Sequence, residues 1–205
     1  MSPYKLVRGL VSIWAKLAYR AEYHGRENEP VGKAFIAFSN HTSFSDPLFT
    51  ACALKSELYF MAKSDLTKKS RFLKFLFKVC NVVTVNRGES DIAALRKSCE
   101  VLKAGGCLGI YPEGTRIPSP APKAENALAG VGLMATRTKV DLLPVTICYG
   151  KKNNKPNIFR KVHVYIGKPI PSEEYLSINE HPNSHEIATY SFGKLCENFE
   201  ENNHD

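Results

Sequence analysis

The chain lacks the cysteine patterns of a disulfide framework or a zinc site. Its 205 residues include six cysteines, none in a Cys-x-x-Cys pair or at zinc-site spacing from histidines. Scattered thiols with apolar neighbours favour reduced core cysteines in a cytosolic compartment. There is also no apolar run of the ~20 residues that span a bilayer, and no signal-peptide pattern at the N-terminus. We therefore expect one domain over residues 1–205, neither secreted nor membrane-spanning.

Acidic residues are scarce except at the C-terminal end. The formal net charge is +8, yet residues 172–205 hold eight acidic side chains and one lysine, which leaves 27 basic against 12 acidic in residues 1–171. Such a cationic body attracts nucleic acid, anionic lipid or phosphorylated metabolites, and charge alone leaves these open. No recognised nucleic-acid motif accompanies the charge, so nucleic acid is the least favoured partner.

Residues 4–21 predict an amphipathic helix whose polar side is basic. Leucine, isoleucine and the single tryptophan lie on one side, and lysine and arginine on the other. This pattern suits the headgroup region of an anionic bilayer, so we expect residues 1–24 to associate with a membrane; a helix packed on its own domain is the alternative. Residues 68–79 interleave cations with phenylalanines. This pattern predicts a face that touches lipid or an acyl chain, and a helix that faces the core with a basic exterior is the alternative. Residues 202–205 are expected to form a flexible tail.

Strand and helix patterns alternate along the rest of the chain. Apolar runs predict strands at residues 34–39, 58–62, 81–85, 107–111, 142–148 and 159–166. Helical spacing predicts helices at residues 46–54, 89–104, 124–137 and 184–201. This alternation predicts an α/β fold with a mainly parallel sheet flanked by helices.

Two polar clusters follow predicted strands. The first runs from Asn40 to Asp46, and the second from Tyr111 to Arg116. Carboxyl ends of parallel strands meet at one edge of an open α/β sheet, where ligands bind. We therefore expect the two clusters to form one site.

His41 and Asp46 are the candidate catalytic pair in the first cluster. Histidine titrates near neutral pH and serves as a base when a carboxylate fixes its tautomer. Asp46-Pro47 is typical of a helix start, with Asp46 as N-cap, and the turn before it would fold Asp46 back beside His41. A serine nucleophile is disfavoured because no Gly-x-Ser-x-Gly elbow is present. A metal is disfavoured because nothing else completes a ligand set.

Arg87 and Arg116 each follow a predicted strand. Two guanidiniums at one edge would bind a phosphate in bidentate fashion. Glu113 would accept hydrogen bonds from hydroxyls or hold Arg116, and Gly114 permits close approach of the backbone. The set predicts a pocket for a phosphate monoester with a free hydroxyl.

These motifs resemble those of the glycerolipid acyltransferases, most closely the lysophosphatidate acyltransferases, over residues 34–147. His41-x-x-x-x-Asp46 resembles the first motif, Val85-Asn86-Arg87 the second, residues 111–116 the third and Leu143-Pro144-Val145 the fourth. Their order, with Glu113 placed 72 positions after His41, is far more specific than any one motif. The chain has Ile117 where many relatives have serine, and Leu128-Ala129-Gly130 where relatives often carry a lysine just before the glycine. These departures leave the acceptor headgroup open.

The resemblance implies an O-acyltransferase that makes phosphatidic acid from 1-acylglycerol-3-phosphate. It implies that His41 is the general base and Asp46 orients it, with substrate bound by Arg87, Glu113, Gly114, Thr115 and Arg116. The amides of the helix after Asp46 would be candidate donors to the oxyanion.

No cofactor or metal is expected; acyl-CoA or acyl-carrier protein would be the co-substrate, at the cytoplasmic face of a membrane. Another lysophospholipid acceptor, a lipid or thioester hydrolase, and a non-catalytic membrane-binding module are the alternatives.

Overall fold

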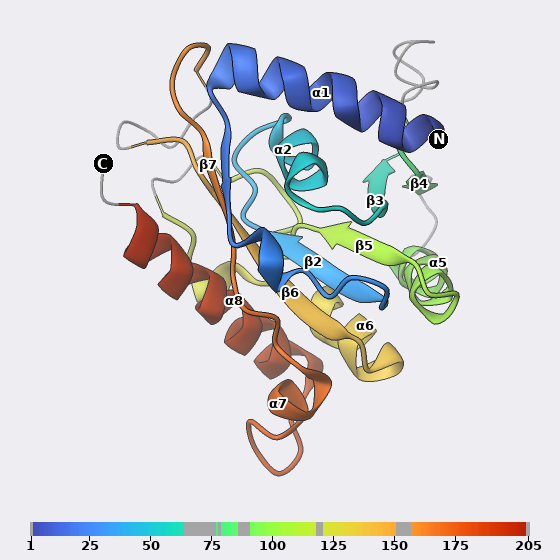
Figure 1. Ribbon diagram of the computed structural model, residues 1–205. Helices are drawn as coiled ribbons and strands as arrows, with labels where there is room; N and C mark the ends of the chain where they lie inside the picture. The colour runs from blue at the N-terminus through green and yellow to red at the C-terminus, as the bar shows by residue number, and fades with distance from the viewer. Residues whose placement is uncertain are drawn as a thin grey trace.

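The protein is built around one seven-stranded sheet in the order β1-β7-β6-β2-β5-β3-β4 (Figure 1). The computed structural model describes residues 2–63, 77, 79–85, 91–117, 121–150 and 157–203. The strands are β1 (Glu22–His24), β2 (Phe35–Ser39), β3 (Leu58–Lys63), β4 (Val82–Val85), β5 (Cys107–Ile110), β6 (Asp141–Cys148) and β7 (His163–Ile166). Among them only the β6–β7 pair is antiparallel, so β1 and β7 run opposite to the other five. The predicted mainly parallel sheet is confirmed.

Helices cover both faces of the sheet. Helices α1 (Pro3–Tyr19) and α2 (Asp46–Ala53) lie on one face, and α5 (Asp91–Lys103), α6 (Gly130–Thr138) and α8 (Ser184–Asn202) on the other (Figure 1). Each face has its own apolar core. A short helix, α7 (Ser172–Leu176), precedes α8, and two 3-10 turns occupy Arg26–Asn28 and Ala124–Asn126.

The burial of strand β2 on both faces explains why its sequence is a continuous apolar run. It lies between β5 and β6, and all five of its residues are buried. Phe35 and Ala37 enter the core under α1 and α2, whereas Ile36 and Phe38 enter the opposite core. A strand covered on both faces needs apolar side chains at every position, not at alternate ones.

Helix α1 is anchored by one face and exposes another. Ser2 caps it by accepting the amide of Lys5, and Pro3 occupies the first turn. Tyr4, Ala15 and Tyr19 are buried against the domain. Within the described part of the chain, no helix is both long and apolar enough to cross a membrane.

Helix α8 begins where the sequence predicts, at a capping box formed by Asn183 and Glu186. Its first turn packs closely on α6: a Cβ on Gly132 would lie 1.9 Å from the carbonyl oxygen of Ser184. Only glycine permits this approach of two helices. The helix runs through Asn202, so the predicted tail at residues 202–205 begins too early; residues 204–205 lie outside the described residues.

Two predicted elements differ from the structure because of tertiary hydrogen bonds. The predicted helix at residues 124–137 is split, since the amide of Leu128 donates to the carbonyl of Pro112 at 2.9 Å and the chain is extended at Ala127. The predicted strand at residues 159–166 starts only at His163, because Phe159 has a positive φ of 69°. Strand β1 and helix α7 were not predicted, because they are too short to show a period. Of the predicted segment at residues 68–79, only residues 77 and 79 are described.

Candidate active site

Three neighbouring parallel strands bring polar residues to one edge of the sheet. Strands β5, β2 and β6 are adjacent, and their carboxyl ends lead into Glu113, His41 and Tyr149 respectively. Asn40 ties two of these ends together: its side chain donates to the carbonyl of Ile147 at 3.0 Å and accepts the amide of Ile147 at 2.9 Å. The site therefore lies at the carboxyl ends of the buried central strands of the sheet.

The turn between β2 and α2 places Asp46 beside His41. The distance from Asp46 Oδ2 to His41 Nδ1 is 2.7 Å, and the same oxygen accepts the amides of Thr42 at 2.8 Å and Ser43 at 2.7 Å. Asp46 has no exposed surface. The predicted N-cap role is wrong, because Ser45 occupies that position and the Asp46 carboxylate turns back to bind the preceding loop.

Asp46 fixes which nitrogen of His41 carries the proton. A carboxylate that accepts two backbone amides is an acceptor, so His41 donates to it through Nδ1. In the neutral imidazole the other nitrogen, Nε2, then holds a lone pair. His41 keeps 18% of its side chain exposed, which leaves the ring accessible from outside.

Tyr149 completes the carboxylate site and was missed by the sequence analysis. Its hydroxyl donates to Asp46 Oδ1, the oxygen that does not bind His41. Burial, and then the charge of Asp46, hold the pKa of Tyr149 well above its usual value, so the hydroxyl keeps its proton. Tyr149 directly follows the strand predicted at residues 142–148, so its position at a strand end was the available signal.

Tyr111 holds the His41 ring from one side. The two rings stack with centroids 4.2 Å apart and an interplanar angle of 26°. The Tyr111 hydroxyl lies 3.2 Å from Thr50 Oγ1 on α2. The imidazole is thus oriented by a hydrogen bond at Nδ1 and by an aromatic face.

Glu113 binds the backbone of the histidine loop. Its Oε2 accepts the amide of His41 at 2.6 Å, and the amide of Ile117 donates to the carbonyl of His41 at 2.8 Å. Glu113 is 7% exposed. Burial raises its pKa to about 7, although the hydrogen bond from His41 acts in the opposite direction. Glu113 was predicted at this edge of the sheet, but its contact with the His41 amide was not.

We expect Glu113→Gln to change the pH dependence of stability. The pKa of Glu113 lies above its usual value of about 4.5, so the folded state holds this proton more tightly than the unfolded chain does. The stabilising contribution of the protonated carboxyl is therefore lost as pH rises from about 4.5 to about 7. Urea unfolding of both proteins across pH 4 to 8 measures this. The variant should gain stability relative to the wild type over that window, and a pH-independent difference would contradict the assignment.

The residues after Glu113 lie at the exposed rim. Gly114, Thr115 and Arg116 are exposed, and the Arg116 guanidinium carbon lies 3.6 Å above the ring centroid of Phe44. Arg116 therefore spans the two motif loops. Arg87 lies outside the described residues, so its convergence with Arg116 stays a prediction.

We expect Gly114→Ala to destabilise the protein by about 1–2 kcal/mol, the usual cost of the left-handed region for a residue with a Cβ. Gly114 has φ +66°, and an added Cβ would lie 2.6 Å from Leu128 Cδ1, an exposed side chain that can turn away. The matched control is Gly32→Ala, with φ +82° and open space around its Cβ position. Urea unfolding should show similar losses, and only Gly114→Ala should also lower activity.

The first turn of α2 does not offer the expected oxyanion donors. The amides of Asp46, Leu48 and Phe49 already donate to carbonyls of Ser43 and Ser45, and Pro47 has no N–H. The helix start therefore serves to hold Asp46 in place.

Comparison with known proteins identifies the family. The family model described as Acyltransferase matches residues 20–148. The 1-acyl-sn-glycerol-3-phosphate acyltransferase of Bacillus subtilis is 23% identical over 175 residues, which cover 84% of this chain and 84% of that protein. The protein of the same name from Streptococcus pneumoniae is 27% identical over 183 residues, 86% of this chain and 66% of that protein.

A solved structure has the same fold. The crystal structure of the 1-acyl-sn-glycerophosphate (LPA) acyltransferase PlsC from Thermotoga maritima superposes with a TM-score of 0.73 at 25% identity, covering 97% of this chain and 80% of that one. The matched family region contains His41, Asp46 and residues 111–116. The chain belongs to the Acyltransferase family and is an O-acyltransferase.

Proposed function

We propose that the protein transfers a fatty acyl group from a thioester donor to the free hydroxyl of 1-acylglycerol-3-phosphate, making phosphatidic acid for phospholipid biosynthesis. The observation that carries the proposal is the oriented His41–Asp46 pair at the same sheet edge as residues 113–116. The names of the relatives from Bacillus subtilis and Streptococcus pneumoniae support the same acceptor.

In the proposed mechanism His41 is the general base. Its Nε2 takes the proton of the glycerol hydroxyl while that oxygen attacks the thioester carbonyl, and the positive charge that forms on the ring lies beside Asp46. The tetrahedral intermediate collapses to an ester and expels the thiolate, which takes the proton back from His41. General base catalysis supplies roughly 10²–10⁴-fold, and positioning of two substrates supplies much of the rest.

Binding of the acceptor is assigned to the exposed residues that follow Glu113. Arg116 lies next to the His41 loop through its contact with Phe44, and its guanidinium suits a phosphate monoester. Arg87 is proposed as its partner on the phosphate, and Thr115 and Gly114 as contacts to the glycerol. The donor is acyl-CoA or acyl-carrier protein, with no further cofactor.

The decisive experiment offers purified protein a panel of lysophospholipids with each donor and identifies the products by mass spectrometry. Phosphatidic acid formed from 1-acylglycerol-3-phosphate is the expected product. Preferential acylation of another headgroup would assign a different acceptor. Fatty acid released equally fast without any acceptor would mean that the His41–Asp46 pair activates water, and the protein would be a hydrolase.

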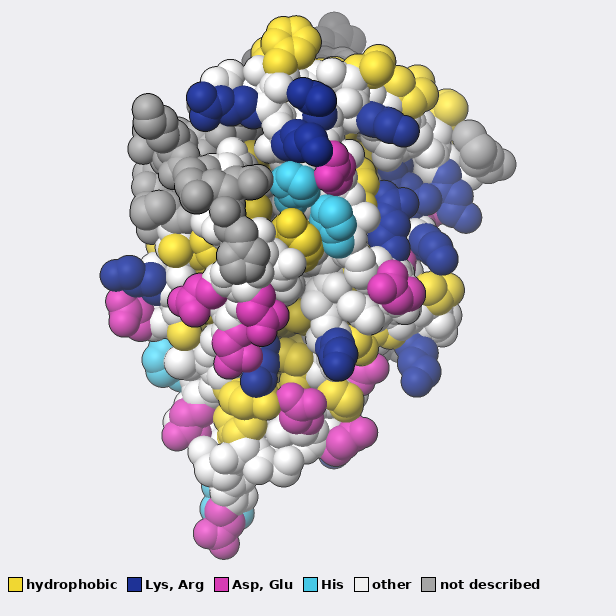
Figure 2. Space-filling model, turned by 60° about the vertical axis from the view of Figure 1, so that its left-hand side comes forward, with side chains coloured by type: hydrophobic (Ala, Val, Ile, Leu, Met, Phe, Trp, Pro, Cys, Tyr) yellow, Lys and Arg dark blue, Asp and Glu magenta, His cyan; other side chains and the backbone are white. Residues whose placement is uncertain are grey.

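We further propose that α1 holds the enzyme on the surface of an anionic membrane, at its cytoplasmic face. Five large apolar side chains of α1 are between 41% and 72% exposed: Leu6, Leu10, Ile13, Trp14 and Leu17. Figure 2 shows apolar and basic side chains along the top of the molecule, where α1 lies, whereas acidic side chains gather lower down. A helix with an apolar stripe and basic flanks suits the bilayer interface.

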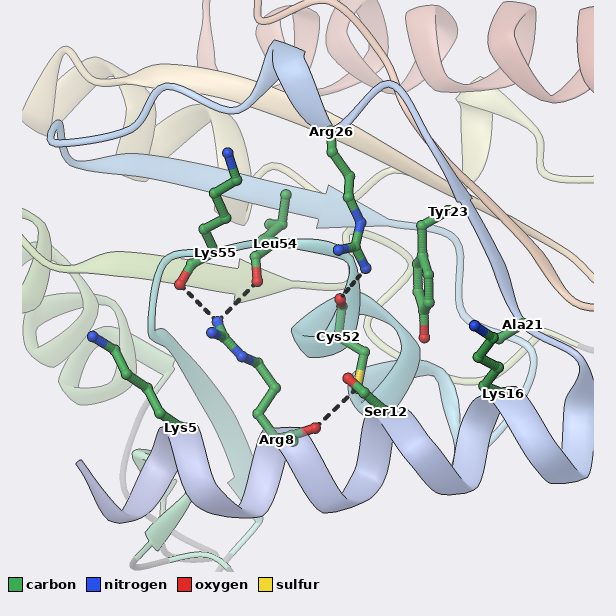
Figure 3. Close-up of a pocket in the computed structure, with 11 residues that line it drawn as sticks. Lys5, Arg8, Ser12, Lys16, Ala21, Tyr23, Arg26, Cys52, Leu54 and Lys55 are labelled. Carbon is green, nitrogen blue, oxygen red and sulfur yellow. Dashed lines mark hydrogen bonds between the residues drawn. The ribbon is translucent and has the colours of Figure 1, made fainter. Parts of the chain in front are cut away.

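A basic cavity of about 640 Å³ lies beside this stripe. Figure 3 shows Lys5, Arg8 and Lys16 pointing from α1 toward Arg26 and Lys55, and no carboxylate lines the cavity in the described residues. The two arginines bind backbone carbonyls at the end of α2: Arg8 Nη1 donates to Leu54 O at 2.9 Å, and Arg26 Nη2 to Cys52 O at 2.8 Å. The three lysines supply the charge that favours anionic headgroups.

We expect the double variant Leu10→Asp with Leu17→Asp to weaken binding to phosphatidylglycerol-containing vesicles at least about 10-fold, because burying each leucine contributes about 1.5–3 kcal/mol. Vesicle sedimentation measures the change. Val31→Asp, at a 63% exposed apolar residue outside α1, is the matched control and should bind as the wild type does. Equal binding by the wild type, the double variant and the control would mean that α1 does not contact the membrane.

A further inference from the structure

The two edge strands β1 and β7 bring two histidines and one carboxylate to a common face, away from His41. In the parallel register Glu22 pairs with His163, and His24 pairs with Tyr165. Residues two apart on a strand point to the same side, so Glu22, His24 and His163 share one face of the sheet. Figure 2 shows a pair of neighbouring histidine side chains with an acidic side chain beside them on the molecular surface.

The three side chains stand at the spacing of metal ligands. His24 Nε2 lies 3.2 Å from His163 Nδ1, and His163 Nδ1 lies 3.5 Å from Glu22 Oε2. All three ligand atoms lie within 4.8 Å of one another. In a tetrahedral zinc site with Zn–N bonds of 2.0–2.1 Å, neighbouring ligand atoms are about 3.3 Å apart. Two of the three separations are therefore already close to those of a bound site.

Neighbouring side chains hold these ligands in place. The Tyr165 ring stacks on His24 with centroids 4.6 Å apart and an interplanar angle of 16°. Lys161 Nζ binds Glu22 Oε1 at 2.7 Å, and the other oxygen of the carboxylate, Oε2, is the one nearer His163. Such outer contacts orient the ligands of metal sites in proteins.

We propose that Glu22, His24 and His163 bind a divalent transition metal of the zinc class, with a fourth position open to water. Two imidazoles and one carboxylate are a common ligand set for such ions. Without metal one of the two facing nitrogens, His24 Nε2 or His163 Nδ1, donates an N–H to the other. On metal binding that proton moves to the other nitrogen of the same ring, so both facing nitrogens offer a lone pair to the metal.

The position of the site gives the metal a structural role. The end of α1 is joined to the segment before β7: Phe159 N donates to Ala18 O at 2.6 Å, and Val162 N to Tyr19 O at 3.1 Å. The site lies just beyond this junction, and strands β7 and β6 separate β1 from β2, which leads into His41. A metal at this site joins β1, the strand that follows α1, to β7. It takes no part in acyl transfer.

The test titrates the metal-free 205-residue chain with Zn²⁺ alone by calorimetry, and with Co²⁺ by visible absorption. We expect one saturable site per chain, an absorption spectrum of tetrahedral Co²⁺ without a thiolate charge-transfer band, and a thermal midpoint that rises with metal concentration. His24→Ala and His163→Ala should each weaken binding at least about 10-fold, since loss of an outer contact alone costs 10–100-fold.

Two controls separate this site from other ligands. His41→Ala, and the double variant His181→Ala with His185→Ala, should bind metal as the wild type does. Glu22→Gln and His24→Asn keep side-chain size and test the site if an alanine variant fails to fold. The proposal is overturned if no saturable binding is found, if Co²⁺ shows thiolate ligation, or if His24 and His163 variants bind as tightly as the controls.

Discussion

Replacing His41 by alanine should lower kcat by about 10²–10⁴-fold, the contribution of a positioned general base. The proposed proton transfer passes through Nε2 of His41. The hydrogen bond from Nδ1 to Asp46 orients this ring. Steady-state assay with 1-acylglycerol-3-phosphate and an acyl thioester measures the loss. Because the chemical step is affected and the rim residues are unchanged, KM for the acceptor should change little.

The fold of this variant should persist. Asp46 keeps the amides of Thr42 and Ser43 and the Tyr149 hydroxyl when the imidazole is removed. Circular dichroism and vesicle binding should therefore match the wild type. His185→Ala, on the exposed first turn of α8, is the matched control and should retain full activity. A His41→Ala protein that is folded and active within a few-fold of the wild type would refute the general-base assignment.

Replacing Asp46 by asparagine should lower kcat by up to about 10⁴-fold while leaving the domain folded. The same change in a serine protease triad costs about 10⁴-fold because the histidine takes the wrong tautomer. That figure is the upper limit here, because an amide oxygen in the place of Asp46 Oδ2 still accepts from His41 Nδ1 and keeps the tautomer. Asparagine has the size of aspartate, so its oxygen can accept the Thr42 and Ser43 amides while its NH₂ faces Tyr149. The neutral amide, however, does not stabilise the imidazolium that the mechanism forms.

A comparison with Tyr149→Phe distinguishes this effect from a packing defect. Asp46→Asn removes the negative charge beside the imidazolium that forms during the reaction, so kcat should fall while KM for the acceptor changes little. Tyr149→Phe removes one hydrogen bond from Asp46 but keeps the charge beside His41. A smaller loss of kcat is therefore expected for Tyr149→Phe. Equal losses of kcat in both variants would mean that Asp46 acts only by packing.

Much of the architecture was predictable because local signals agreed with the tertiary fold. The apolar run of β2 reflects burial on both faces, and the capping box and helical spacing of α8 place its start at Ser184. Predictions failed where a distant group decided the local structure. Leu128 leaves the helix pattern to bind the carbonyl of Pro112, and Phe159 takes a positive φ where its amide meets Ala18.

The sequence by itself determined the parallel α/β architecture, the cationic body and the two motif loops at strand ends, because periodicity and residue type are local properties. Only the tertiary structure decided that Tyr149 binds Asp46, that Glu113 binds the His41 amide, and that Glu22, His24 and His163 meet. These contacts join residues that lie between 72 and more than 130 positions apart in the sequence. Whether such residues meet depends on which strands are neighbours in the sheet. Strand order and register arise from the packing of the whole core, and no local pattern encodes them.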